Sequence, residues 1–110
     1  MLESPTNPRM QVCDLQKLTD AAHEVGALVA VDNSIMTFLY QRPLDMGADI
    51  SMTSATKFIG GHSDVMAGLL SIKDEQLAQR VYFHQAGPQP RQPCFTAPFA
   101  FPKLGHIKRL

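Results

Sequence analysis

The sequence predicts an α/β fold in which a mostly parallel sheet is flanked by helices. Apolar residues at helical spacing in residues 14–26 lead, through a very short connection, into the apolar run 27–31. Such a run is typical of a parallel strand that is buried on both faces. Two further strand patterns, at residues 50–54 and 67–72, follow it along the chain. We therefore expect one αβ unit that is continued by additional strands of the same sheet.

The first helix is predicted after an extended N-terminal segment. Pro5 and Pro8 exclude a helix from the first nine residues, which we expect to be extended or turning. Asp14 can cap the helix, and Gly26 is placed to end it. The apolar residues at helical spacing between them are Leu15, Leu18, Ala22 and Val25.

Residues 33–40 have no clear periodicity, so their structure is left open. Residues 42–47 predict a short helical turn that ends at Gly47. Residues 50–54 alternate as a short strand, residues 60–64 read as a loop, and residues 67–72 predict another strand. A second helix is expected from Asp74 onward, with apolar positions at Leu77, Ala78, Val81 and Tyr82.

The C-terminal part of the chain has a different composition. Five prolines fall within residues 88–102, and a basic segment follows at residues 103–110. Because proline is incompatible with a helix interior and with a central strand, we expect this part to be disordered. The predicted organisation is a folded unit at residues 1–85 and a proline-rich tail at residues 86–110.

Composition limits the function classes. The 110 residues are 45% hydrophobic, enough for one small core, and ten basic residues balance ten acidic ones. Without a basic stripe, nucleic acid is not expected as a partner. The apolar runs are far shorter than the roughly 18 residues of a spanning helix, so no membrane interaction is expected. Two distant cysteines and four scattered histidines predict neither a disulfide framework nor a metal site, and they favour a reducing compartment.

The chemistry-bearing segment is the Ser-Ala-Thr-Lys sequence of residues 54–57, which ends a predicted strand and precedes a glycine pair. The amine of Lys57 can form a Schiff base with a carbonyl. The hydroxyls of Ser54 and Thr56, with backbone N–H groups of a glycine-rich turn, can hold a phosphate. Asp32, at the end of the apolar run, can keep a pyridine nitrogen protonated. Together these groups suit pyridoxal 5′-phosphate (PLP).

Each residue also has a structural explanation. Most lysines are solvated surface charges, Ser and Thr near strand ends commonly form turns, and an Asp-Asn pair after a strand commonly forms a turn or a helix cap. His62 could line an active site, but we favour the interpretation that residues 62–64 tie their loop to itself.

Three ordered segments nevertheless resemble one known family. They are Glu-Ser-Pro-Thr-Asn-Pro at residues 3–8, Val-Asp-Asn-Ser at residues 31–34, and Ser-Ala-Thr-Lys-Phe-Ile-Gly-Gly-His-Ser-Asp-Val at residues 54–65. In this order they resemble the signatures of the Cys/Met-metabolism PLP-dependent enzymes, the trans-sulfuration family. Residues 31–50 and 62–68 are most similar to the plant β-lyases of that family. Thr53 stands where family members commonly have histidine.

The resemblance implies the large domain of a type I PLP-dependent transferase-like fold and a carbon–sulfur lyase. The expected reaction is β-elimination of cystathionine to homocysteine, pyruvate and ammonia, in methionine biosynthesis. It further implies that Lys57 binds the cofactor, with Asp32 at its ring nitrogen, Asn7 at its phenolic oxygen, and Ser54 and Thr56 at its phosphate. The intact family forms homotetramers, and the plant members are chloroplast enzymes.

The resemblance covers about residues 2–84, so we expect residues 1–85 to be an internal fragment of the PLP-binding domain and residues 86–110 to be a divergent tail. The family's ring-stacking tyrosine, its Tyr/Arg pair that reaches a neighbour's phosphate, and its arginine for the substrate carboxylate lie outside the matching segments. Two alternatives follow. One is a γ-acting relative, either a cystathionine γ-synthase or a γ-lyase. The other is a non-catalytic truncated product that associates with full-length subunits.

Overall fold

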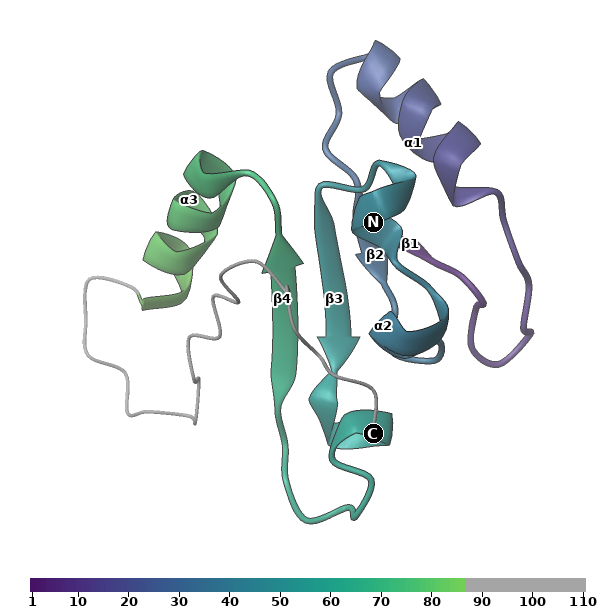
Figure 1. Ribbon diagram of the computed structural model, residues 1–110, viewed down its shortest axis with the longest axis vertical. Coiled ribbons are helices and arrows are strands. Elements are labelled where there is room, and N and C mark those ends of the chain that lie inside the picture. The colour runs from purple at the N-terminus through teal and green to yellow at the C-terminus, as the bar shows by residue number, and fades with distance from the viewer. Residues whose placement is uncertain (87–110) are drawn as a thin grey trace.

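A computed structural model describes residues 1–86 as a four-stranded sheet with flanking helices (Figure 1). Neighbouring strands follow the order β1-β2-β3-β4. The first three are parallel and the last is antiparallel to its neighbour, which confirms the mostly parallel prediction. The elements are β1 (Leu2–Glu3), α1 (Leu15–Glu24), β2 (Ala30–Asp32), α2 (Thr37–Tyr40), the 3₁₀ turn η1 (Pro43–Met46), β3 (Ile50–Ser54), the π turn η2 (Ala55–Ile59), β4 (Gly68–Ile72) and α3 (Glu75–Ala86).

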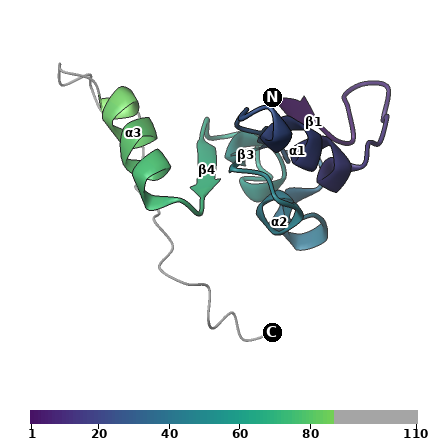
Figure 2. The same ribbon diagram turned by 90° about the horizontal axis from the view of Figure 1, so that it is seen from above.

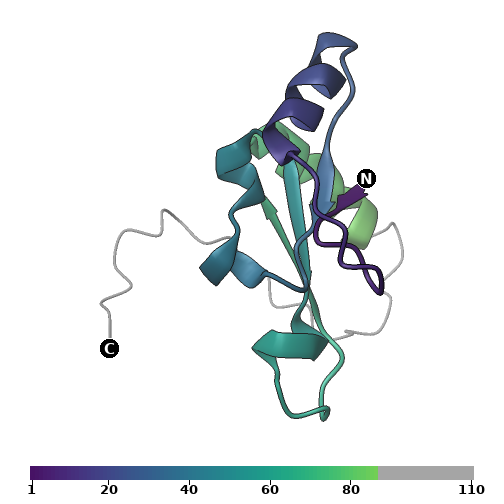
Figure 3. The ribbon, with the colours of Figure 1, turned by 90° about the vertical axis from the view of Figure 1, so that its right-hand side faces the viewer.

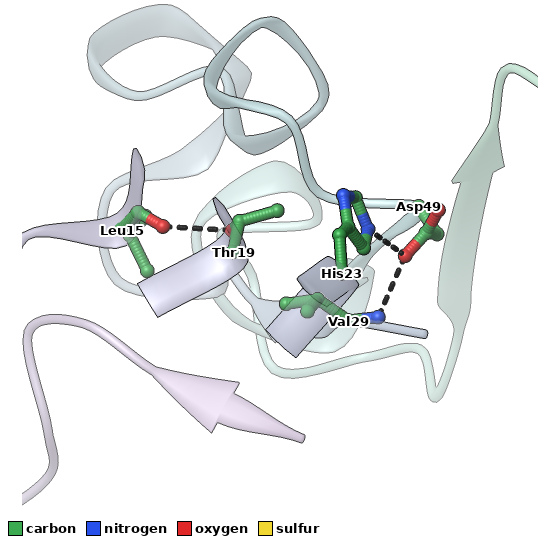
Figure 4. Close-up of polar contacts among 5 residues, drawn as sticks. All are labelled: Leu15, Thr19, His23, Val29 and Asp49. Atoms are coloured by element: carbon green, nitrogen blue, oxygen red, sulfur yellow. Dashed lines mark hydrogen bonds and ion pairs between the residues drawn. The ribbon is translucent and has the colours of Figure 1, made fainter. Parts of the chain in front are cut away.

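Helix α1 begins and ends where the sequence predicts. The Asp14 side chain accepts a hydrogen bond from the Lys17 N–H at 3.1 Å and so satisfies one of the free donors of the first turn. Gly26 follows the helix with φ +72°, a left-handed conformation that glycine adopts without strain. The Thr19 hydroxyl, which is fully buried, donates to the Leu15 carbonyl at 2.7 Å (Figure 4). The helix therefore buries a polar group whose hydrogen bond is satisfied.

The core lies between α1 and one face of the sheet. Its fully buried centre is Val31 on β2, and its other buried members are Leu15, Val29 and Ala48. Leu2, Val31 and Ser51 are register partners, so their side chains point to this same face. Asp32 and Met52 are the next register pair and therefore point to the opposite face.

The predicted strand at residues 27–31 is wrong in its first three residues. The strand begins at Ala30, while Leu28 is 59% exposed. Asp49 Oδ2 accepts a hydrogen bond from the Val29 N–H at 2.7 Å and lies 3.0 Å from His23 Nε2 (Figure 4). This carboxylate takes the place of a strand partner for the Val29 N–H, while the Val29 carbonyl accepts from the Ile50 N–H at the start of β3 at 3.1 Å. Residues 27–29 therefore connect α1 to the first register pair of β2, at Ala30.

Two elements come from segments that the sequence left undecided. The extended N-terminal segment pairs with β2 as β1, and part of residues 33–40 forms α2. The predicted turn before Gly47 is confirmed as η1, with Gly47 in a left-handed conformation at φ +92°.

Strand β4 and helix α3 lie at the side of the sheet away from α2 (Figure 2). Both match the prediction, and Asp74 Oδ1 accepts a hydrogen bond from the Leu77 N–H at 2.6 Å at the start of α3. Within residues 1–86, no helix is long and apolar enough to cross a membrane. The predicted proline-rich tail, apart from its first residue, lies outside the described residues.

Candidate functional site

Two predicted site residues end neighbouring parallel strands. Asp32 is the last residue of β2, and Ser54 is the last residue of β3. Asp32 pairs in register with Met52, two positions before Ser54, so both side chains point to the same face. The π turn η2 then carries Thr56 and Lys57 at the end of the sheet opposite α1 (Figure 3). The carboxyl edge of the sheet therefore gathers four of the five predicted residues.

Ser34 connects the ends of the two strands, and sequence reasoning did not select it. Its N–H donates to Asp32 Oδ1 at 2.9 Å, and its Oγ accepts from the Ser54 N–H at 2.7 Å. The available signal was its position two residues after an aspartate at a strand end, where the aspartate commonly accepts a local hydrogen bond. Asp32 Oδ2 makes no hydrogen bond within the described residues.

The two hydroxyl residues of the predicted phosphate cradle differ in their bonding. The half-buried Ser54 hydroxyl makes no side-chain hydrogen bond within residues 1–86. Thr56 Oγ1 instead donates to the Ala67 carbonyl at 3.2 Å and accepts from the Ala67 N–H at 2.8 Å. A hydroxyl has a single proton to donate. Thr56 therefore closes the loop between η2 and β4, and it can donate to a phosphate only by releasing Ala67.

Lys57 is exposed and lies in an irregular part of η2. Its backbone has φ −85° and ψ −112°, outside the helical region, while Gly60 and Gly61 N–H groups donate to Ala55 O and Lys57 O at 2.7 and 2.8 Å. A Cβ on Gly60 would lie 2.9 Å from Ala55 O, so the turn requires glycine there. His62 Nδ1 lies 2.7 Å from Gly60 O, which confirms for this residue that it ties its own loop.

Asn7 lies in the turn after β1 and is exposed. In the described part of the chain, its side chain hydrogen-bonds none of the other four predicted residues. The loop from Ser4 to Cys13 that carries Asn7 has hydrogen bonds within it, and its last residue, Cys13, donates to the Ser4 hydroxyl. Its placement at the site therefore depends on how Ser4 is held.

No cluster of three or more metal-binding side chains lies within residues 1–86. The site presents an exposed amine, a carboxylate with one engaged oxygen, and a hydroxyl without a partner. Such a set suits an organic group that carries a carbonyl, a basic ring nitrogen and a phosphate.

Sequence comparison agrees with that donor set. Residues 1–100 match the family described as Cys/Met metabolism PLP-dependent enzyme. The chain belongs to this family. Its members are PLP-dependent trans-sulfuration enzymes, and PLP is their cofactor.

Three relatives illustrate the range of the family. The chain is 64% identical over 84 residues to a chloroplastic cystathionine beta-lyase of Arabidopsis thaliana. The matched segment is 76% of this chain and 18% of the relative. It is 48% identical over 84 residues to a cystathionine gamma-synthase/O-acetylhomoserine (thiol)-lyase of Bacillus subtilis, and this segment is 76% of the present chain and 22% of that relative. A crystal structure of Xanthomonas oryzae cystathionine gamma synthase in complex with cystathionine superposes with a TM-score of 0.71 at 44% identity. The superposed part is 73% of this chain and 21% of that one.

The chain therefore spans about a fifth of the length of these relatives. Its fold is that of part of their α/β domain, as the sequence predicts. The residues present fit PLP: Lys57 has an exposed amine, Asp32 has an oxygen without a protein partner, and Ser54 has an unused hydroxyl in the described structure.

Proposed function

We propose that this chain forms the cofactor-holding part of a PLP-dependent carbon–sulfur lyase that acts on cystathionine by β-elimination. The products are homocysteine, pyruvate and ammonia. The observation that carries the proposal is the 64% identity to the Arabidopsis beta-lyase, across the segment that contains Asp32, Ser54, Thr56 and Lys57. The juxtaposition of Asp32 and Ser54 through Ser34 supports it.

Each residue has a distinct role in this proposal. Lys57 would hold the cofactor covalently, and its amine would serve as the base for the α-proton of the substrate. Asp32 keeps a proton on the ring nitrogen, since a carboxylate favours a neighbouring cation. PLP, when bound, supplies an electron sink. The phosphate is assigned to Ser54 and Thr56.

Asn7 is assigned to the phenolic oxygen of the cofactor. An amide donor near that oxygen tunes the electronics of the reacting centre. Its exposed position after β1 leaves the side chain free of other hydrogen bonds in residues 1–86. The proposal therefore needs the loop that carries Asn7 to be held at a defined distance from Asp32.

A γ-acting enzyme is the second candidate, because the B. subtilis gamma-synthase is 48% identical over an equally long segment. A γ-lyase would cleave cystathionine to cysteine, a four-carbon keto acid and ammonia, whereas a γ-synthase would form cystathionine from cysteine and an activated homoserine. Product analysis of an intact relative that carries this segment separates these reactions.

A non-catalytic role is the candidate from another class. Strands β1 and β4 each have one neighbour in the described sheet, and apolar side chains such as Phe58 and Met66 are 68% and 86% exposed. Such edges and surfaces favour association with full-length subunits.

For the proposed enzyme we assign a homotetrameric assembly by analogy with the family, and a chloroplast location by analogy with the Arabidopsis relative.

Borohydride reduction tests the proposed function. The chain is incubated with PLP, reduced and digested, and the peptides are mapped by mass spectrometry. We expect the pyridoxyl mark on Lys57. Lys73 serves as the internal comparison, because its Nζ donates to Leu44 O at 2.9 Å and to Asp45 Oδ1 at 3.1 Å. A mark on Lys73 that equals or exceeds that on Lys57 contradicts the assignment.

A further inference from the structure

A pair of side-chain amides joins the ends of β1 and β2 beside the site. Asn33 Nδ2 donates to the main-chain carbonyl of Gln41 at 2.8 Å, and Gln41 Nε2 donates back to Asn33 Oδ1 at 2.9 Å. The same Nε2 donates to the Ser4 carbonyl at 2.8 Å, across 37 positions of sequence. Asn33 and Ser4 are each 2% exposed. The Gln41 amide therefore donates to two buried residues, Ser4 directly after β1 and Asn33 directly after β2.

Ser4 anchors the loop that carries Asn7. Its Oγ accepts from the Cys13 N–H at 3.2 Å, so the first residue of the loop is hydrogen-bonded to the last. Inside the loop, the Thr6 N–H donates to Gln11 O at 2.9 Å and the Met10 N–H to Thr6 O at 2.7 Å. The loop is therefore a closed unit whose position depends on Ser4.

The other end of the connection is fixed to the site. Asn33 directly follows Asp32, and its N–H donates to Met52 O at 2.7 Å, which ties it to β3. The chain between Asn33 and Gln41 is held by the Thr37 N–H, which donates to Asn33 O at 2.8 Å. Gln41 thus reaches from the Asp32 strand end to the Asn7 loop.

We propose that Gln41 is a positioning residue of the cofactor site, which sets the distance between the Asn7 loop and Asp32. The inference rests on the proposed function for the meaning of that distance. Neither Gln41 nor Asn33 belongs to the set of residues assigned to touch the cofactor. Loss of the Gln41 amide leaves two buried acceptors without that donor, a loss that a buried network tolerates poorly.

Three variants test the proposal in the 110-residue chain. Gln41→Met keeps the side-chain length and removes both donors. Gln41→Asn keeps the amide but shortens its reach, and it replaces the first variant if Gln41→Met does not fold. Gln16→Met is the matched control, because Gln16 is exposed on α1.

The first measurement is amide hydrogen exchange without cofactor. We expect the Thr6 and Met10 N–H groups to exchange about tenfold faster in the Gln41 variants, since one net hydrogen bond of about 1.4 kcal/mol corresponds to that factor. The Ser54 N–H should keep its rate, and the Gln16 control should change none of them. Unchanged loop rates, or an equal acceleration at all three groups, overturns the proposal.

The second measurement is the pH dependence of the visible absorbance of Lys57-bound cofactor. If Gln41 acts by placing Asn7, adding Asn7→Ala to Gln41→Met changes the titration no further. Independent, additive changes overturn the proposal. A wild-type chain that forms no Lys57-bound cofactor contradicts the proposed function, and the exchange rates then decide alone whether Gln41 positions the loop.

Discussion

Asp32 uses one carboxylate oxygen for Ser34 and leaves the other without a partner in residues 1–86. In an intact relative that carries this segment, we expect Asp32→Asn to lower turnover about a hundredfold, the scale on which one preorganised electrostatic group acts. The amide oxygen can still accept from Ser34, so the cofactor should still bind. Asp20→Asn, exposed on α1, is the control. Near-normal turnover of Asp32→Asn would show that another group protonates the ring nitrogen.

At Gly47, both the backbone conformation and a close neighbour disfavour any side chain larger than hydrogen. Its φ is +92°, and an added Cβ would lie 3.1 Å from Thr19 Cγ2 on α1. Gly26 has φ +72° but nothing within 4 Å of an added Cβ. We therefore expect Gly47→Ala to lower the free energy of unfolding more than Gly26→Ala does.

The backbone cost common to both substitutions is about 1–2 kcal/mol. Denaturant titration of the two variants and the wild type measures the difference, which reports the contact between η1 and α1. Equal losses in both variants would mean that Thr19 yields freely to the added methyl group.

At the scale of elements, Asp49 joins the end of α1 to the start of β3. Partial burial raises the pKa of Asp49, but the Val29 N–H and the His23 side chain outweigh it and lower the pKa below its ordinary value of 3.8. A carboxyl whose pKa is lowered on folding stabilises the fold above its unfolded pKa. That contribution is lost as the pH falls through the folded value.

We expect Asp49→Ala to cost about 2 kcal/mol at neutral pH, as for a hydrogen bond to a charged group. The difference from wild type should shrink as the pH falls below about 4, where the wild-type carboxylate is also neutralised. Thermal unfolding followed by circular dichroism from neutral to acidic pH measures this. Asp20→Ala, at an exposed position of α1, is the control, and a difference that stays constant with pH would exclude an electrostatic contribution.

The π turn η2 places the candidate cofactor lysine, Lys57, just beyond the end of β3. Strand β3 ends at Ser54, Lys57 follows three residues later, and the chain turns at Gly60, where an added Cβ would lie 2.9 Å from Ala55 O. Thr56 and Ala67 close the loop that follows. The short segment therefore holds the amine at the sheet edge without using a regular helix.

At the scale of the whole molecule, we expect the chain alone to release no pyruvate from cystathionine. It covers about a fifth of the length of its relatives. From the family resemblance, we expect the ring-stacking and substrate-carboxylate residues outside the matching segments. Losing such orientation costs several kcal/mol of barrier. A coupled pyruvate assay with and without PLP measures the outcome, with Lys57→Ala as control. Sustained release above that control would contradict the prediction.

The same incompleteness predicts the chain's behaviour in solution. The open strand edges and exposed apolar residues favour self-association or co-assembly with an intact relative. Size-exclusion chromatography with light scattering, on the chain alone and mixed with the Arabidopsis enzyme, measures both. A stable monomer that ignores the intact enzyme would argue against the associating role.

Much of this protein was determined by the sequence alone. Local signals decided α1 with its Asp14 cap and Gly26 stop, the turn at Gly47, strand β3 and helix α3, because capping, glycine conformation and periodicity act within a few residues. Three ordered motifs likewise pointed to the family, since residue types that suit PLP occur in them in the family's order.

Tertiary structure decided what depends on distant partners. The two-residue β1 exists because β2 offers it hydrogen bonds, and β2 starts at Ala30 because Asp49, twenty positions away, takes the Val29 N–H. The Ser34 and Gln41 connections join segments 20 and 37 positions apart. Such contacts leave no periodic trace in a sequence, because a hydrogen bond between distant residues requires only that the fold bring one donor to one acceptor.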